Sequence, residues 1–116
     1  MEEIIGILFH GRNVAHKEHL RTKSYAQHKA LGNFYDNVID LADKLAEAYQ
    51  GDEGIMQDIP LIGKDAVEPI ADFLERQMNS IETLRHEAST RTAIQNIIDE
   101  VIGLYLSTIY KLRNLS

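Results

Sequence analysis

Residues 15–51, AHKEHLRTKSYAQHKALGNFYDNVIDLADKLAEAYQG, decide the fold of this chain. Apolar side chains recur in this stretch every three or four residues, which is the spacing of one face of an α-helix. Thr22 and Ser24 precede the apolar run and carry side chains that cap helix N-termini. The sequence therefore predicts a long amphipathic helix that begins after these caps and ends at Gly51.

Three further segments have a similar apolar spacing. The first covers residues of about 2–20, although two glycines weaken its pattern. Another resumes at Lys64, includes Val67 on its apolar face and Pro69 in its first turn, and runs to about residue 87. The last follows a cap at Ser89 or Thr90 and finishes with two basic residues, where the helix dipole favours cations.

The link between the second and third helices is too long for a tight helical hairpin. Residues 51–63 hold three glycines and a proline, with one short helical turn expected around 55–59. Since no segment has the alternation of a strand, the chain is predicted to be all-α, a four-helix bundle whose long connection between helices 2 and 3 crosses over along the bundle.

Composition limits the classes of function. The chain has 116 residues, 44% hydrophobic and 26% charged, which fits a single globular domain over residues 1–116. No cysteine is present, so any metal must be held by His, Asp and Glu. The net charge of −6 makes nucleic acid an unexpected partner. The longest apolar run is too short to span a membrane and the acidic N-terminus is unlike a signal peptide, so we expect a cytoplasmic protein.

A possible metal site lies on the long helix. Asp43 and Glu47 are one turn apart on one face and can reach the same ion. His28 shares that side of the helix but lies about 22 Å from Asp43 along it, at 1.5 Å per residue. These side chains meet only if a second copy of the helix packs antiparallel across a two-fold axis. The predicted partner is therefore the chain itself, as a homodimer or larger shell across this helix.

The spacing resembles the ferroxidase region of the Dps-type ferritins. That family's ligand pattern corresponds here to His16, His28, Gly32, Asp43 and Glu47, so four of five positions agree in type and Gly32 replaces an aspartate. The segment LADKLAEAYQG and the C-terminal Leu-Arg pair are also similar to the family. A tryptophan that usually follows the first histidine is replaced by Lys17. The compact chain would suit a short, divergent, virus-encoded member.

The resemblance implies a ferritin-like bundle that binds and oxidises Fe(II) with peroxide or oxygen at a between-subunit site. Its ligands would be His16, His28, Asp43 and Glu47, with Asp36 as a substitute for the missing aspartate, and no catalytic group beyond them. Zinc and manganese suit the same ligand types. The Glu-x-x-His motif of intrachain di-iron sites is absent from the sequence.

Plainer interpretations stay open. An Asp and a Glu one turn apart on an acidic helix also occur as a solvated face. His19 is expected to pack at a helix end, His10 and His86 to lie on the surface, and the tyrosines at helical spacing to pack in the core or at its rim. The alternative function is a non-catalytic helical bundle that acts as a structural or interaction module.

Overall fold

The computed structural model describes residues 1–116 and contains four helices and no strand. The helices are α1 (Glu2–Arg21), α2 (Tyr25–Glu53), α3 (Ile70–Ala88) and α4 (Thr92–Asn114). The predicted all-α class and the four predicted helices are confirmed. None of the four helices is both long and apolar enough to cross a membrane.

The helix ends differ from the prediction in several places. Ser24 caps α2 as expected, since its side chain accepts a hydrogen bond from the Gln27 amide. The helix does not end at Gly51 but continues to Glu53 and stops at Gly54, whose φ of 94° favours glycine. Neither Ser89 nor Thr90 is the N-cap of α4; that position is Arg91, which makes no capping bond with its side chain.

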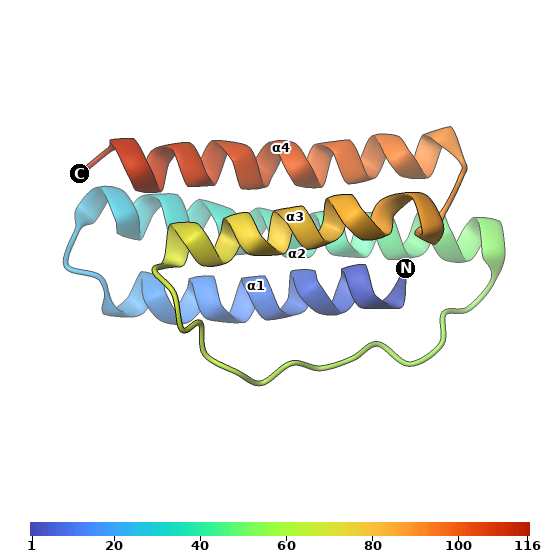
Figure 1. The fold of residues 1–116 in the computed structure, drawn as a ribbon, viewed down its shortest axis with the longest axis horizontal. Coiled ribbons are helices and arrows are strands. Elements are labelled where there is room, and N and C mark those ends of the chain that lie inside the picture. Colours follow the sequence, from blue (N-terminus) through green and yellow to red (C-terminus); the bar gives the residue numbers. More distant parts are fainter.

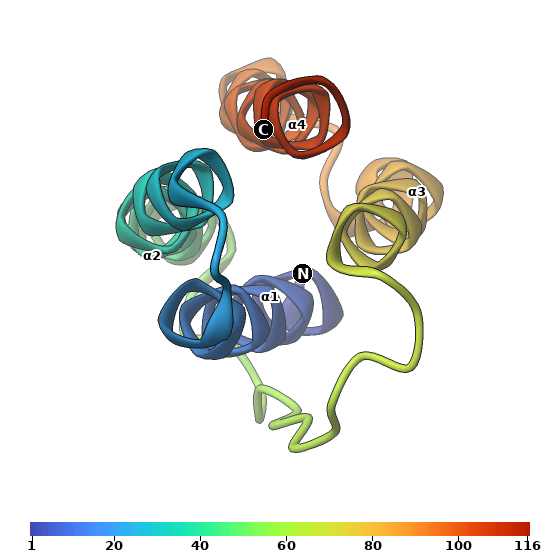
Figure 2. The same cartoon turned by 90° about the vertical axis from the view of Figure 1, so that its left-hand side faces the viewer.

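The four helices form a bundle in which every neighbouring pair is antiparallel. Viewed down the bundle, α1 lies between α2 and α3, and α4 lies between the same two helices on the opposite side (Figure 2). The pairs α1/α2 and α3/α4 are each joined by a short turn, whereas α2 and α3 run in the same direction (Figure 1). The bundle therefore consists of two helical hairpins side by side.

Residues 54–69, which we call the crossover, return the chain along the outside of α1 to the start of α3 (Figure 1). The predicted long connection is confirmed, but its helical turn around 55–59 does not form. Val67 is also outside α3 and is 98% exposed, because the helix begins only after Pro69. Gly6 lets the crossover approach closely, since a Cβ at this position would lie 2.6 Å from the Pro60 carbonyl oxygen.

The core is formed by the apolar faces of all four helices. Phe34 and Tyr105 are fully buried, and their rings meet edge to face with centroids 5.0 Å apart. Burial of each such side chain stabilises the fold by roughly 1.5–3 kcal/mol. The Tyr105 hydroxyl donates a hydrogen bond to Gln77 Oε1 over 2.9 Å, and Gln77 Nε2 donates to the Ile7 carbonyl. This contact ties α1, α3 and α4 together inside the core.

Candidate functional site

The clearest cluster of chemically functional side chains lies between the C-terminal end of α1 and the N-terminal end of α2. His19 of α1 and His28 of α2 stack with ring centroids 3.8 Å apart and planes 19° apart. The two residues also exchange hydrogen bonds: His19 Nδ1 lies 2.6 Å from the His28 carbonyl oxygen, and His28 Nδ1 lies 2.8 Å from the His19 carbonyl oxygen. They join the two helices across the turn that connects them.

These hydrogen bonds fix the protonation pattern of both rings. A carbonyl oxygen only accepts, so each Nδ1 must carry the donated proton. In the neutral rings each Nε2 is then an unprotonated acceptor, with no hydrogen-bond partner in the chain.

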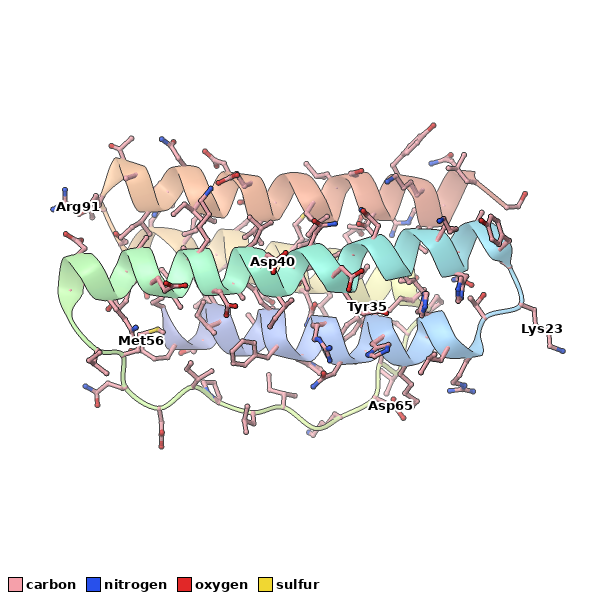
Figure 3. The ribbon with its side chains drawn as sticks, turned by 180° about the vertical axis from the view of Figure 1, so that it is seen from behind. Lys23, Tyr35, Asp40, Met56, Asp65 and Arg91 are labelled. Atoms are coloured by element: carbon pink, nitrogen blue, oxygen red, sulfur yellow. The ribbon has the colours of Figure 1, made fainter.

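Tyr35 extends the cluster along the groove between the helices. Its ring stacks on His16 with centroids 4.2 Å apart and planes 14° apart, and meets His19 edge to face at 5.2 Å. The Arg12 guanidinium lies 5.7 Å from the centre of the Tyr35 ring, within the range of a cation–π contact. Figure 3 shows Tyr35 where α2 faces α1. We call His16, His19, His28 and Tyr35 the histidine cluster.

Gly32 makes room for the histidine cluster. A Cβ at this position would lie 3.0 Å from His19 Cε1 and 3.2 Å from His19 Nδ1, closer than ordinary packing allows. An aspartate side chain there would displace the His19 ring. The residue that departs from the Dps pattern therefore has a packing role in this chain.

The structure places the predicted metal ligands as follows. His16 and His28 belong to the histidine cluster, whereas Asp36, Asp43 and Glu47 are exposed on α2 and form no ion pair. No three His, Asp or Glu side chains within the chain converge as a metal site. Nor can His19 and His28 readily chelate one ion, because their stacked rings direct lone pairs along separate planes. The between-subunit site stays a prediction.

Two features of the surroundings were not predicted from the sequence. His10, expected on the surface, is only 9% exposed, and its ring meets Phe73 edge to face at 5.2 Å. The crossover is tethered to α1 by carboxylates at both of its ends. The Gln57 amide donates to Glu2, and Lys17 pairs with Asp65. The partners in each of these two contacts lie far apart in the sequence, and nothing in the sequence indicates that they meet.

The contacts that tether the crossover to α1 also change the pKa values of the carboxyl groups involved. Backbone N–H donors, first that of Glu2 itself and then that of Gln57, lower the pKa of the Glu2 carboxyl. The hydrogen bond from the Lys17 ammonium, with its positive charge, lowers the pKa of Asp65. In the core, burial raises the pKa of the Tyr105 hydroxyl far above its usual range, so this group stays a hydrogen-bond donor in the folded protein.

The fold and the histidine cluster define a small all-α protein, a four-helix bundle with one long crossover. Residues 19–112 match the family described as "Family of unknown function (DUF5856)", and the chain belongs to this family. It is also similar to the "Uncharacterized 14.6 kDa protein in mobD-ri intergenic region" of Enterobacteria phage T4. The two are 32% identical over 116 residues, which cover 96% of this chain and 86% of the relative. No solved structure matches the chain.

These comparisons correct the family resemblance. The chain was predicted to be Dps-like, but it matches the DUF5856 family and the phage protein, and no Dps or ferritin family is among the matches. The prediction was wrong because spacings of four and eleven residues, as from His28 to Glu47, recur on any amphipathic helix. Two of the four matched ligand types, His16 and His28, are explained here by contacts between α1 and α2.

Proposed function

We propose that this protein is a helical interaction module that assembles with a second copy of itself through the outer face of α4. The observation that carries the proposal is the exposure of Leu106 and Tyr110, at 54% and 58%, one turn apart on the same face of α4. Tyr110 was expected to pack in the core or at its rim, but it points away from the bundle. A pair of large apolar side chains at this spacing is typical of a helix that packs against another helix.

Gly103 supports close packing on this face. It lies one turn before Leu106 and Ser107, and a Cβ at this position would contact nothing in the chain. Glycine inside a helix costs about 1 kcal/mol relative to alanine. Packing within the monomer does not explain the glycine, whereas the close approach of a second helix would.

The charges that flank this face favour an antiparallel, two-fold arrangement. Asp99 and Glu100 lie before the apolar pair, and Lys111 and Arg113 lie after it. In an antiparallel dimer centred near Leu106, the acidic end of one α4 meets the basic end of the other, whereas a parallel dimer would bring like charges together. Asp99 and Glu100 stay partly exposed beside their partners in α3 and α2, so a second cation can reach them.

The α2 face that the sequence favoured as a dimer contact is less suitable without metal. Asp36, Asp40, Asp43 and Glu47 carry no ion pair, so two α2 helices packed antiparallel would oppose acid to acid. Figure 3 shows Asp40 on the outside of α2. Repulsion of this kind makes the α4 face the preferred contact.

A cation-bridged dimer across α2 is a second candidate, because bound cations would neutralise those same acids. It would place His28 of one copy near Asp43 and Glu47 of the other, with Fe(II) as the predicted ion. His28 Nε2 has no hydrogen-bond partner in the chain and could serve as a ligand. One long crossover also occurs in ferritin-like bundles. A ferritin-like arrangement, like the iron chemistry, stays a proposal.

Sedimentation velocity over a range of protein concentrations tests the α4 dimer. We expect a monomer–dimer equilibrium without added metal that a Leu106→Ser, Tyr110→Ser variant abolishes. Val67→Ser is the control, since it removes an even more exposed apolar side chain from the crossover and should leave the dimer intact. A monomer at all concentrations, or equal loss in both variants, would overturn the proposal.

The same experiment distinguishes the cation-bridged α2 dimer from the α4 dimer. Dimers that form only when Fe(II) is added under anaerobic conditions, and that are lost in a His28→Ala, Glu47→Ala variant, would assign the contact to α2. Persistence of the dimer in that double variant assigns it to another face.

A further inference from the structure

A polar hollow lies between α1 and the crossover, on the side of α1 away from the histidine cluster. Its volume is about 330 Å³. The lining residues are His10, Asn13, Val14, Lys17, Ile62, Gly63, Lys64 and Asp65. Figure 3 shows Asp65 where the crossover passes the C-terminal half of α1. Neither the proposed α4 contact nor the α2 acids border this hollow.

His10 provides the hollow with a hydrogen-bond acceptor, its ring nitrogen Nδ1. His10 Nε2 lies 2.7 Å from the Lys64 carbonyl oxygen, and since that oxygen only accepts, Nε2 carries the proton. The neutral ring therefore presents an unprotonated Nδ1, which has no partner in the chain. No fully buried side-chain nitrogen or oxygen lacks a partner, so Nδ1 must keep some accessible surface. We place that opening at the hollow, which the otherwise buried His10 lines.

Hydrogen-bond donors are also present among the residues that line the hollow. Lys64 forms no ion pair, unlike Lys17, whose charge is offset by Asp65. The backbone N–H groups of residues 62–65 donate to no acceptor in the chain. Free backbone N–H groups can donate hydrogen bonds to bound anions. With the Lys17–Asp65 pair neutral overall, Lys64 leaves the hollow with a net positive charge in a chain of net charge −6.

We propose that this hollow binds a small protonated oxyanion of the phosphate class. The anion's P–OH group donates to His10 Nδ1, while its other oxygens accept from the Lys64 ammonium and from backbone N–H groups of the crossover. The Asp65 carboxylate also borders the hollow and would repel the anion, but Lys17 holds it. An oxyanion without a proton cannot make the bond to Nδ1 and would instead meet its lone pair.

The difference between phosphate and sulfate therefore tests the site. Both are tetrahedral oxyanions, but slightly above neutral pH phosphate keeps a proton and sulfate does not. We expect inorganic phosphate to cause saturable shifts of the amide NMR signals of residues 62–65. At matched ionic strength, sulfate should bind about tenfold more weakly or worse, as expected for loss of one hydrogen bond and a lone-pair contact.

Lysine variants provide the control for general charge effects. Lys64→Ala should weaken phosphate binding by about tenfold, the factor that one charge-assisted hydrogen bond supplies. Lys23→Ala removes the same charge from the α1–α2 turn, where it forms no ion pair, and should leave binding unchanged (Figure 3). Equal affinity for phosphate and sulfate, equal loss in both variants, or no saturable shift at residues 62–65 would each overturn the proposal.

Discussion

Tyr105 and Gln77 are joined by a buried hydrogen bond, 2.9 Å from the hydroxyl to Oε1. A polar side chain on the core face of α3 is tolerated there because all of its polar atoms have partners. Helices α1, α3 and α4 therefore share one specific polar contact within a mainly apolar core.

The first prediction concerns this bond. Tyr105→Phe leaves Gln77 Oε1 buried without a donor, and we expect the free energy of unfolding to fall by about 1–3 kcal/mol. Urea denaturation followed by circular dichroism measures the change. Adding Gln77→Leu removes the unpaired group and should recover part of the loss. If the double variant were as unstable as the sum of the two single variants, the account would be wrong.

Gly11 lies against the same bond. A Cβ there would overlap Gln77 Oε1 and lie 3.0 Å from the Tyr105 hydroxyl. We expect Gly11→Ala to lower the free energy of unfolding by about 1–3 kcal/mol because it overpacks the core. Gly51→Ala is the control within α2, where a Cβ meets nothing, and should raise stability by up to about 1 kcal/mol. Equal effects of the two substitutions on the thermal midpoint would contradict this reading.

A third prediction concerns Gly32. Gly32→Asp restores the carboxylate of the Dps pattern, but its side chain must displace His19. We expect it to destabilise the protein by about 1–3 kcal/mol, as overpacking does, and to abolish the slowly exchanging Nδ1 proton signals of His19 and His28 in NMR spectra. Gly51→Asp makes the same charge change on α2 in open space and should leave both signals intact. Their survival in Gly32→Asp would show that the stack tolerates the new side chain.

Acid should loosen the crossover. Glu2 and Asp65 have lowered pKa values in the folded chain, so their tethers stabilise it fully above the ordinary carboxyl pKa. That contribution is lost as pH falls through the folded values, because both carboxylates are then protonated. Amide exchange at Gln57, corrected for the intrinsic effect of pH, should therefore speed up in this acidic range.

A pair of variants isolates the Glu2 tether. Glu2→Ala removes the acceptor and should already show fast exchange at Gln57 near neutral pH. Asp58→Ala removes a neighbouring carboxylate that makes no hydrogen bond and should keep the acid-dependent change. Retention of slow exchange in Glu2→Ala would mean that packing, rather than this bond, holds the crossover.

Helical periodicity was sufficient to predict the four helices and the long connection, because burial of an apolar face dominates their formation. It did not predict the end of α2, since Gly51 is tolerated at an exposed position and only Gly54 needs a positive φ. The sequence singled out His16 and His28 within residues 15–51, but it did not predict their ring contacts between α1 and α2. His28 shares a side of α2 with Asp43, yet its ring turns toward α1, which a one-helix projection cannot show.

Contacts between residues far apart in the chain could not be predicted from the sequence. His10 is buried because the crossover covers it, and that contact joins His10 to the Lys64 carbonyl across 54 positions. Backbone carbonyls are the same in every residue, so the sequence cannot reveal such a partner. The hollow beside His10 could be found only once the path of the crossover was known.

The crossover also has a consequence for how the chain folds. Its two flanking hairpins, α1/α2 and α3/α4, are each closed by contacts between sequence neighbours, which form quickly because little loop entropy is lost. Docking of the hairpins requires residues 54–69 to span the length of the bundle. At high concentration, the same segment can deliver α3 and α4 to the first hairpin of a different molecule. We therefore expect a high refolding concentration to favour an exchanged pair over a closed monomer.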